Sequence, residues 1–151
     1  MLYLITFLLA LPSGIIWIFN AEVLVVTQVQ NGGGTPWVIA LITTAGQFCG
    51  YATLYLFANQ FLARLKIVQR AVAKIESKVR IDRPGWGTYA MFATGGLCGI
   101  PPLLGLFALY GSARAGRLTR LLIAAAPGRI CWYMTWAYAP DFLRENFGLF
   151  T

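Results

Sequence analysis

Three long apolar stretches, separated by polar or interrupted segments, dominate the hydrophobic pattern of the chain. Residues 2–19 and 36–58 contain no charged side chain, and residues 121–140 contain only Arg129. About 20 helical residues cross a hydrocarbon core of about 30 Å, so each stretch is long enough to span a bilayer. The pattern predicts transmembrane helices at residues 1–19, 36–58 and 121–140.

Two further segments are apolar but interrupted. Residues 20–35 mix Glu22 with valines and end in a run of glycines, and residues 85–111 are uncharged but broken near their middle by Gly95, Gly99, Pro101 and Pro102. Non-helical backbone is tolerated at membrane depth only where it lines a protein cavity. We therefore expect a re-entrant segment at 20–35 and a re-entrant hairpin at 85–111, with a single kinked span as the alternative for the second.

Residues 61–80 show a different, amphipathic pattern. Apolar side chains recur every three or four positions from Phe61 to Val79, and basic side chains occupy positions between them. This spacing predicts a basic helix that lies on the cytoplasmic headgroups. Two interpretations stay open: a solvated connector with basic anchors, or a helix that recognises anionic lipid.

Composition supports a membrane protein with a defined orientation. Hydrophobic residues make up 58% of the 151 residues and charged residues only 11%, whereas soluble domains carry about a quarter charged residues. Seven of the twelve basic residues lie between positions 64 and 83, and three more between 114 and 120. Because both clusters adjoin apolar runs, the positive-inside rule explains them better than nucleic-acid binding does.

These observations predict the class and the topology. The chain is expected to be a single all-α integral membrane domain, residues 1–151, in the cytoplasmic (inner) membrane. It would have about three full transmembrane helices, two re-entrant hairpins and one amphipathic interfacial helix. With both basic clusters inside, three spans place the N-terminus in the cytoplasm and the C-terminus outside.

The scarcity of reactive side chains limits the chemistry. The chain has no histidine and only five acidic residues, so we expect no metal site, no cofactor and no enzymatic activity. The three cysteines lie within apolar runs and are interpreted as small buried residues. The tryptophans are interpreted as interface anchors.

Two charged residues in apolar surroundings are the main candidates for a functional site. Glu22 is the only carboxylate in an apolar segment, and Arg129 lies well inside the last predicted span. A buried arginine is costly unless it is paired or hydrated, so Arg129 either pairs with Glu22 or extends to the cytoplasmic interface. Thr43 and Gln47 add polar groups to the middle span.

Small residues at four-residue spacing predict close helix packing. Gly46 and Gly50 form such a pair in the middle span, and Gly95 and Gly99 form another in the hairpin. This spacing lets a second helix approach closely.

The order of these motifs resembles a known family. Glu22 is followed by a polar stretch before Trp37, then by Ala45-Gly46-Gln47-Phe48-Cys49-Gly50 and Tyr55, then by Ile100-Pro101-Pro102, Tyr110-Gly111-Ser112-Ala113-Arg114 and Gly128-Arg129. Over roughly residues 20–140 this is similar to the VTT-domain superfamily, the DedA-like or SNARE-associated Golgi proteins, and most similar to its small YqaA-like branch.

The resemblance implies two re-entrant hairpins that face each other in the bilayer, with lipid translocation as the activity. Glu22 then matches the carboxylate of the first hairpin, Arg129 the Gly-Arg position of the last helix, and Arg114 the arginine at the exit of the second hairpin. The chain departs from bacterial carrier-lipid members at Tyr51, where they have aspartate, and at Cys98 and Leu104, where they have arginines.

Two functions follow as hypotheses. The first is a lipid translocase or scramblase for polyprenyl phosphate or phospholipid, with Glu22, Thr43, Gln47, Arg114 and Arg129 as lipid-binding residues and anionic headgroups as partners. The second is a non-transporting accessory or assembly subunit of a larger membrane complex. A homo-oligomer is compatible with both, and nucleic acid is expected in neither.

Overall fold

The computed structural model describes residues 2–15, 20–32, 34–61, 85–99 and 102–147. In these ranges the chain forms six helices and no strand: α1 (Leu2–Ser13), α2 (Ala21–Gln30), α3 (Pro36–Phe61), α5 (Trp86–Cys98), α6 (Leu103–Ser112) and α7 (Leu118–Phe147). The prediction of an all-α protein is therefore confirmed for this part of the chain. Apart from Phe61, which ends α3, the amphipathic helix predicted at 61–80 lies outside the described residues.

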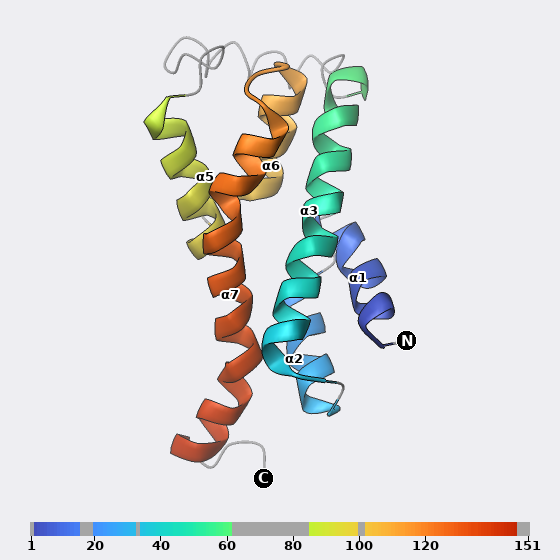
Figure 1. Ribbon diagram of the computed structural model, residues 1–151, viewed down its shortest axis with the longest axis vertical. Helices are drawn as coiled ribbons and strands as arrows, with labels where there is room; N and C mark the ends of the chain where they lie inside the picture. The colour runs from blue at the N-terminus through green and yellow to red at the C-terminus, as the bar shows by residue number, and fades with distance from the viewer. Residues whose placement is uncertain (1, 16–19, 33, 62–84, 100–101, 148–151) are drawn as a thin grey trace.

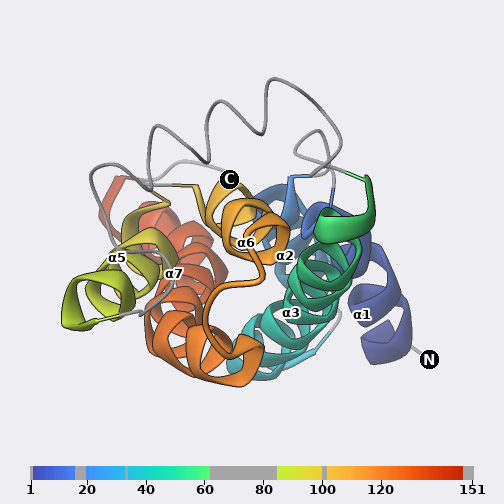
Figure 2. The same ribbon diagram turned by 90° about the horizontal axis from the view of Figure 1, so that it is seen from above.

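Two long helices form the centre of the structure and four short ones flank them. α3 and α7 run along most of its length in opposite directions (Figure 1). α1 packs on the outer side of α3, α5 packs on the outer side of α7, and α2 and α6 lie between the two long helices (Figure 2). The short helices form two hairpins, α1–α2 beside one half of the long helices and α5–α6 beside the other half (Figure 1).

The two halves of the chain share one plan in opposite orientation. Each consists of two short helices followed by a long one, α1–α2–α3 and α5–α6–α7. In each half the first short helix packs on its own long helix, and the second packs on the long helix of the other half. This arrangement of inverted repeats brings the tips of both hairpins to the middle of the structure (Figure 1).

The structure differs from the sequence-based prediction at the N-terminus. The helix expected over 1–19 ends at Ser13, after Pro12 and before Gly14, two residues that interrupt helices. A 12-residue helix rises only about 18 Å and cannot cross a bilayer. Two helices, and not three, thus run the length of the structure. α1 instead forms a hairpin with α2, which lies in the segment 20–35 that was expected to re-enter the membrane by itself.

Local sequence signals explain the ends of the short helices at the hairpin tips. Asn20 caps α2, because its side-chain oxygen accepts hydrogen bonds from the backbone N–H groups of Glu22, at 3.0 Å, and Val23, at 3.4 Å. α5 ends at Gly99, whose φ of 69° is left-handed, and α6 starts directly after Pro102. These caps end the helices near mid-height of the long pair.

Glycines allow each outer helix to approach its long helix closely. A Cβ at Gly50 would meet the backbone of Leu11 and Gly14, and one at Gly46 would meet Phe7 and Ala10. The predicted Gly46–Gly50 face therefore contacts α1 of the same chain. At the other interface the close contact joins Gly96 to α7, where Gly128 meets α5. Gly95 is buried in α5, but Gly99 has open space where a Cβ would be and does not take part.

Among the described residues, α3 is the one helix that has the length and hydropathy expected of a membrane span, over Pro36–Ala58. α1 and α6 are apolar but shorter.

Cys49, Cys98 and Cys131 are exposed, so the interpretation of the cysteines as buried is wrong. They lie on the outer faces of helices whose inner faces are occupied by glycine, alanine and aromatic residues.

Gly50→Ala is expected to destabilise the protein by about 1–3 kcal/mol, because the new methyl group meets backbone that can move only if α1 shifts as a whole. Gly105→Ala is the matched control, since its Cβ has only the ring of Pro102 at 3.8 Å and its site is exposed. In thermal unfolding in detergent micelles, Gly50→Ala lowers the midpoint and Gly105→Ala does not. Equal midpoints for the two variants would contradict the packing described.

Candidate functional site

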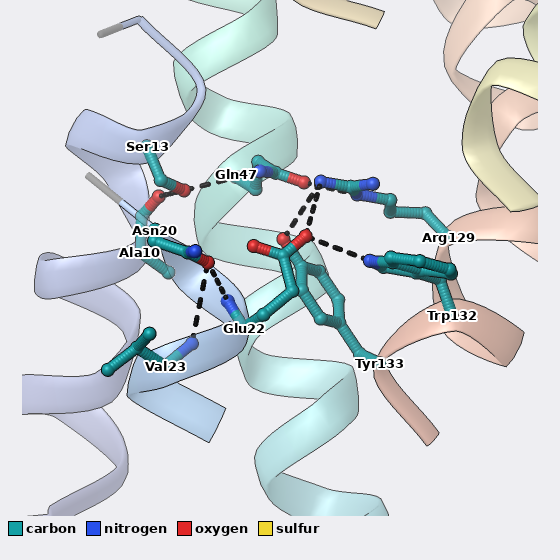
Figure 3. Close-up of polar contacts among 9 residues, drawn as sticks. All are labelled: Ala10, Ser13, Asn20, Glu22, Val23, Gln47, Arg129, Trp132 and Tyr133. Atoms are coloured by element: carbon teal, nitrogen blue, oxygen red, sulfur yellow. Dashed lines mark hydrogen bonds and ion pairs between the residues drawn. The ribbon is translucent and has the colours of Figure 1, made fainter. Parts of the chain in front are cut away.

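Arg129 lies at the centre of a polar network between the two halves of the chain. It stands near the middle of α7 and is only 8% exposed. Its Nε donates a hydrogen bond to Gln47 Oε1 at 2.7 Å, and its Nη2 donates to the Tyr133 hydroxyl at 3.2 Å (Figure 3). Its Cζ also lies 4.9 Å from the centre of the Tyr133 ring, within range of a cation–π interaction.

Glu22 provides the opposite charge. Its Oε1 lies 3.6 Å from Arg129 Nη2 and accepts a hydrogen bond of 2.8 Å from Trp132 Nε1. Glu22 occupies the first turn of α2, where the positive end of the helix dipole favours a carboxylate. The ion pair and the helix position both favour a carboxylate at this place.

Gln47 links the guanidinium of Arg129 to the first hairpin. Its Nε2 donates to Ser13 Oγ at 3.3 Å, and Ser13 Oγ donates to the Ala10 carbonyl at 2.6 Å. An amide has one acceptor end and one donor end, so this arrangement directs the oxygen of Gln47 to Arg129. A continuous series of hydrogen bonds thus crosses from α1 through α3 to α7 (Figure 3).

A cavity of about 180 Å³ adjoins this network where the hairpin tips meet. Both tips and both long helices line it, through Ser13, Asn20, Ala21, Glu22, Gln47, Tyr51, Gly99, Pro102, Leu103, Leu104, Arg129 and Trp132. The charged and amide groups therefore share a space of limited size with apolar side chains such as Leu103 and Leu104.

The contacts of Arg129 leave one of its donor nitrogens unused. Nε and Nη2 of Arg129 have the partners given above, and Nη1 has no hydrogen-bond partner among the described residues. Guanidinium groups bind carboxylates and phosphates through paired N–H donors. The arrangement is thus able to hold an anionic group beside Arg129, in competition with Glu22.

The structure brings together three of the five predicted lipid-binding residues. Glu22, Gln47 and Arg129 all line the cavity, and Arg129 pairs with Glu22 instead of extending to the end of the bundle. Thr43 lies one turn from Gln47, fully buried and outside the cavity lining. Within the described ranges, its Oγ1 is the one buried side-chain oxygen or nitrogen without a hydrogen-bond partner.

Arg114 is placed elsewhere. It follows α6, with a φ of 52°, and is exposed in the connection to α7, away from the cavity lining. Of the two hairpin prolines, Pro102 lines the cavity and Pro101 lies outside the described residues.

Sequence reasoning missed the aromatic part of the site. Trp132 was expected at an interface, yet it holds the carboxylate of Glu22, and Tyr133 contacts Arg129 while fully buried. The sequence did contain a signal for these two residues. They follow Arg129 by three and four positions, and residues at this spacing lie on the same face of a helix. Tyr51 and Leu104 also line the cavity.

No protein-family model, curated protein or solved structure matches this chain. Within the part of the chain that the structure describes, no three histidine, cysteine, aspartate or glutamate side chains converge as metal ligands would. The chemistry of the site is that of a buried cation paired with a carboxylate beside a small polar cavity.

A double-mutant cycle tests the contact between Gln47 and Arg129. Gln47→Leu leaves a buried charged donor without its acceptor, which costs about 1–3 kcal/mol. If the two side chains form this bond, Gln47→Leu and Arg129→Leu show a coupling energy of about 0.5–3 kcal/mol in unfolding measurements.

The control pair is Arg129→Leu with Thr135→Val. Thr135 lies on α7 but is exposed and bonds only to the Cys131 carbonyl. Its effect should add to that of Arg129→Leu, and an equally large coupling in both pairs would show that the measured value does not report the Gln47–Arg129 bond.

Proposed function

We propose that the chain is a multi-pass membrane protein that moves lipids with anionic headgroups between leaflets, as a translocase or scramblase. The observation that carries this proposal is the Arg129–Glu22 pair beside a cavity at the meeting point of two opposed hairpins. In transporters built from inverted repeats, substrate sites lie at this place, near the bilayer midplane. The superfamily resemblance drawn from the sequence supports the same proposal.

Exposed apolar surface supports the membrane location. On α1, Leu4 is 62% exposed and Leu8 55%, and on α3 Leu56 is 62% exposed. Soluble monomers rarely expose contiguous apolar patches of this kind, and lipid contact explains them. α3 has 26 residues, a rise of about 39 Å, which suffices for a full crossing.

In this arrangement α3 and α7 cross the bilayer, and the two hairpins enter it from opposite faces. Each hairpin covers only half of the membrane thickness, and their tips meet at the charged site (Figure 1). Asn20, Gly99 and Pro102 at these tips line the polar cavity, which is where a bilayer tolerates irregular backbone.

The arginines around the start of α7 indicate the orientation of the protein in the membrane. Arg114 and Arg117 lie in the connection between α6 and α7, and Arg120 lies in the first turn of α7, all three exposed. The positive-inside rule places this end in the cytoplasm. The start of α1 and the last turns of α7 lie in the other half of the structure (Figure 1), so both termini belong on the outer side, in contrast to the N-terminus-inside topology expected from three spans.

The structure offers less support for an assembly subunit. That hypothesis used glycine-rich helix faces as surfaces for partner proteins. Gly46 and Gly50 contact α1, Gly96 contacts α7, and Gly111 contacts the backbone of Tyr55 in α3. These faces are thus occupied by helices of the same chain.

Arg129→Ala is expected to abolish lipid transfer, because the cavity loses its only cation among the residues that line it. Arg129→Lys keeps the charge without the planar donor pair, so it should retain partial activity. The measurement is the rate at which dithionite bleaches fluorescent phosphatidylglycerol in proteoliposomes, where only outer-leaflet lipid reacts until transfer exposes the rest.

Arg117→Ala is the control, since it removes an exposed arginine that does not line the cavity. It should transfer lipid at the rate of the parent protein. Parent-like transfer by Arg129→Ala would refute the proposed role of this site.

Topology is tested separately by placing epitope tags at the two ends of the chain. Both tags should be accessible to an impermeant protease on intact cells, because α1 begins and α7 ends in the same half of the structure. A protected N-terminal tag combined with an accessible C-terminal tag would instead support three full crossings.

A further inference from the structure

A second depression adjoins the charged site. It has a volume of about 490 Å³ and lies between α2 and α7, lined by Asn20, Glu22, Val23, Val26, Thr27, Trp132 and Trp136. Asn20, Glu22 and Trp132 also line the central cavity. We call this depression the α2–α7 groove; it adjoins the cavity at these three residues, where Trp132 donates its hydrogen bond to Glu22.

The groove changes character along its length. Its inner end has the amide of Asn20, the carboxylate of Glu22 and the ring of Trp132. Its outer part has two valines and the ring of Trp136, which meets the Trp132 ring edge to face with centres 6.0 Å apart. Val23 at its edge is 60% exposed. A molecule that fits this surface has a polar head and an apolar tail.

The corresponding interface in the other half of the structure is closed. α6 packs on α3 with Gly111 against the Tyr55 backbone, and the rings of Tyr51 and Phe107 stack with centres 4.9 Å apart. The Tyr55 hydroxyl also donates to the carbonyls of Ala115 and Gly116, at 3.2 and 2.8 Å. The two halves share a plan but differ in packing, since the groove lies along one side of the contact between α2 and α7.

We propose that the α2–α7 groove is the lateral opening through which a lipid with an anionic phosphate headgroup reaches Arg129. The phosphate occupies the central cavity beside Arg129, and the first part of the tail lies between Val26 and Trp136. Because α2 lies in the half of the structure opposite the α6–α7 arginines (Figure 1), the groove opens to the outer leaflet. This inference rests on the proposed membrane location and adds the side from which the lipid enters.

Charge and space together select the occupant. Arg129 is the only basic residue of the cavity and Glu22 the only acidic one, so a phosphate gains the unused Nη1 donor and replaces Glu22 at Nη2. Because the displaced Glu22 can pair with an ammonium group, discrimination against phosphatidylcholine rests on the bulk of its trimethylammonium group in a cavity of about 180 Å³. Phospholipids and polyprenyl phosphates share the phosphate chemistry required here.

The test is photocrosslinking in vesicles of phosphatidylcholine with a minor share of phosphatidylglycerol. Benzoylphenylalanine replaces Val23 in the groove, which is 60% exposed, or, as a control, Leu8 of α1, which is 55% exposed. Their helices, α2 and α1, lie in the same half of the structure. Mass spectrometry then identifies the lipids captured at each position.

We expect the Val23 position to capture phosphatidylglycerol in severalfold excess over its share of the bilayer, and the Leu8 position to capture both lipids in proportion. Arg129→Gln should lower the excess at Val23 to the Leu8 value, and Arg129→Lys, which keeps the charge, should retain most of it. Proportional capture at Val23, or an excess that persists in Arg129→Gln, would overturn the proposal.

The crosslinking result and the transfer assay separate the two proposals. Selective capture at Val23 without transfer between leaflets supports the groove as a lipid site and overturns the translocase function. Transfer that depends on Arg129, with proportional capture at Val23, supports the function and overturns the groove as its route.

Discussion

The buried guanidinium of Arg129 is the constraint on which the rest of the structure depends. An unpaired charge in a low-dielectric interior costs several kcal/mol, so its partners must be supplied from other helices. Gln47 comes from α3, Glu22 from α2, and Ser13 of α1 orients Gln47. Each partner lies near the middle of a long helix or at a hairpin tip. The hydrogen bonds and the ion pair of Arg129 therefore form only if the first hairpin ends halfway along the long helices.

Close backbone contacts make this convergence possible. The network needs α1 to lie directly against α3, and Gly50 lacks the side chain that would hold these two helices apart. Gly96 allows the same close approach of α5 to α7. Overpacking at such positions costs about 1–3 kcal/mol, comparable to the free energy of a charged hydrogen bond. Packing and polar pairing are therefore coupled, and loss of either displaces the hairpin tips.

Inverted halves with unequal packing suit a protein that must hold a site and also open it. The α3–α6 interface combines stacked rings with hydrogen bonds from Tyr55 to two backbone carbonyls. The α2–α7 interface combines a buried apolar cluster that includes Val25, Tyr133 and Ala137 with an open groove. In the proposed mechanism the first interface provides the rigid frame, and the second provides the route between lipid and the central charge.

The sequence by itself determined the helical class, the interruptions at Pro12–Gly14 and Gly99–Pro102, and the need of Arg129 for a partner, because these follow from local propensity and the cost of burying charge. Glu22 was identifiable as that partner because it is the only carboxylate in an apolar segment. Only the tertiary structure decided that α1 is half of a hairpin, that Arg114 is remote, and that Trp132 and Tyr133 belong to the site. An apolar run has the same pattern whether it spans a membrane or turns back, and the contacts that distinguish the two join residues far apart in the chain.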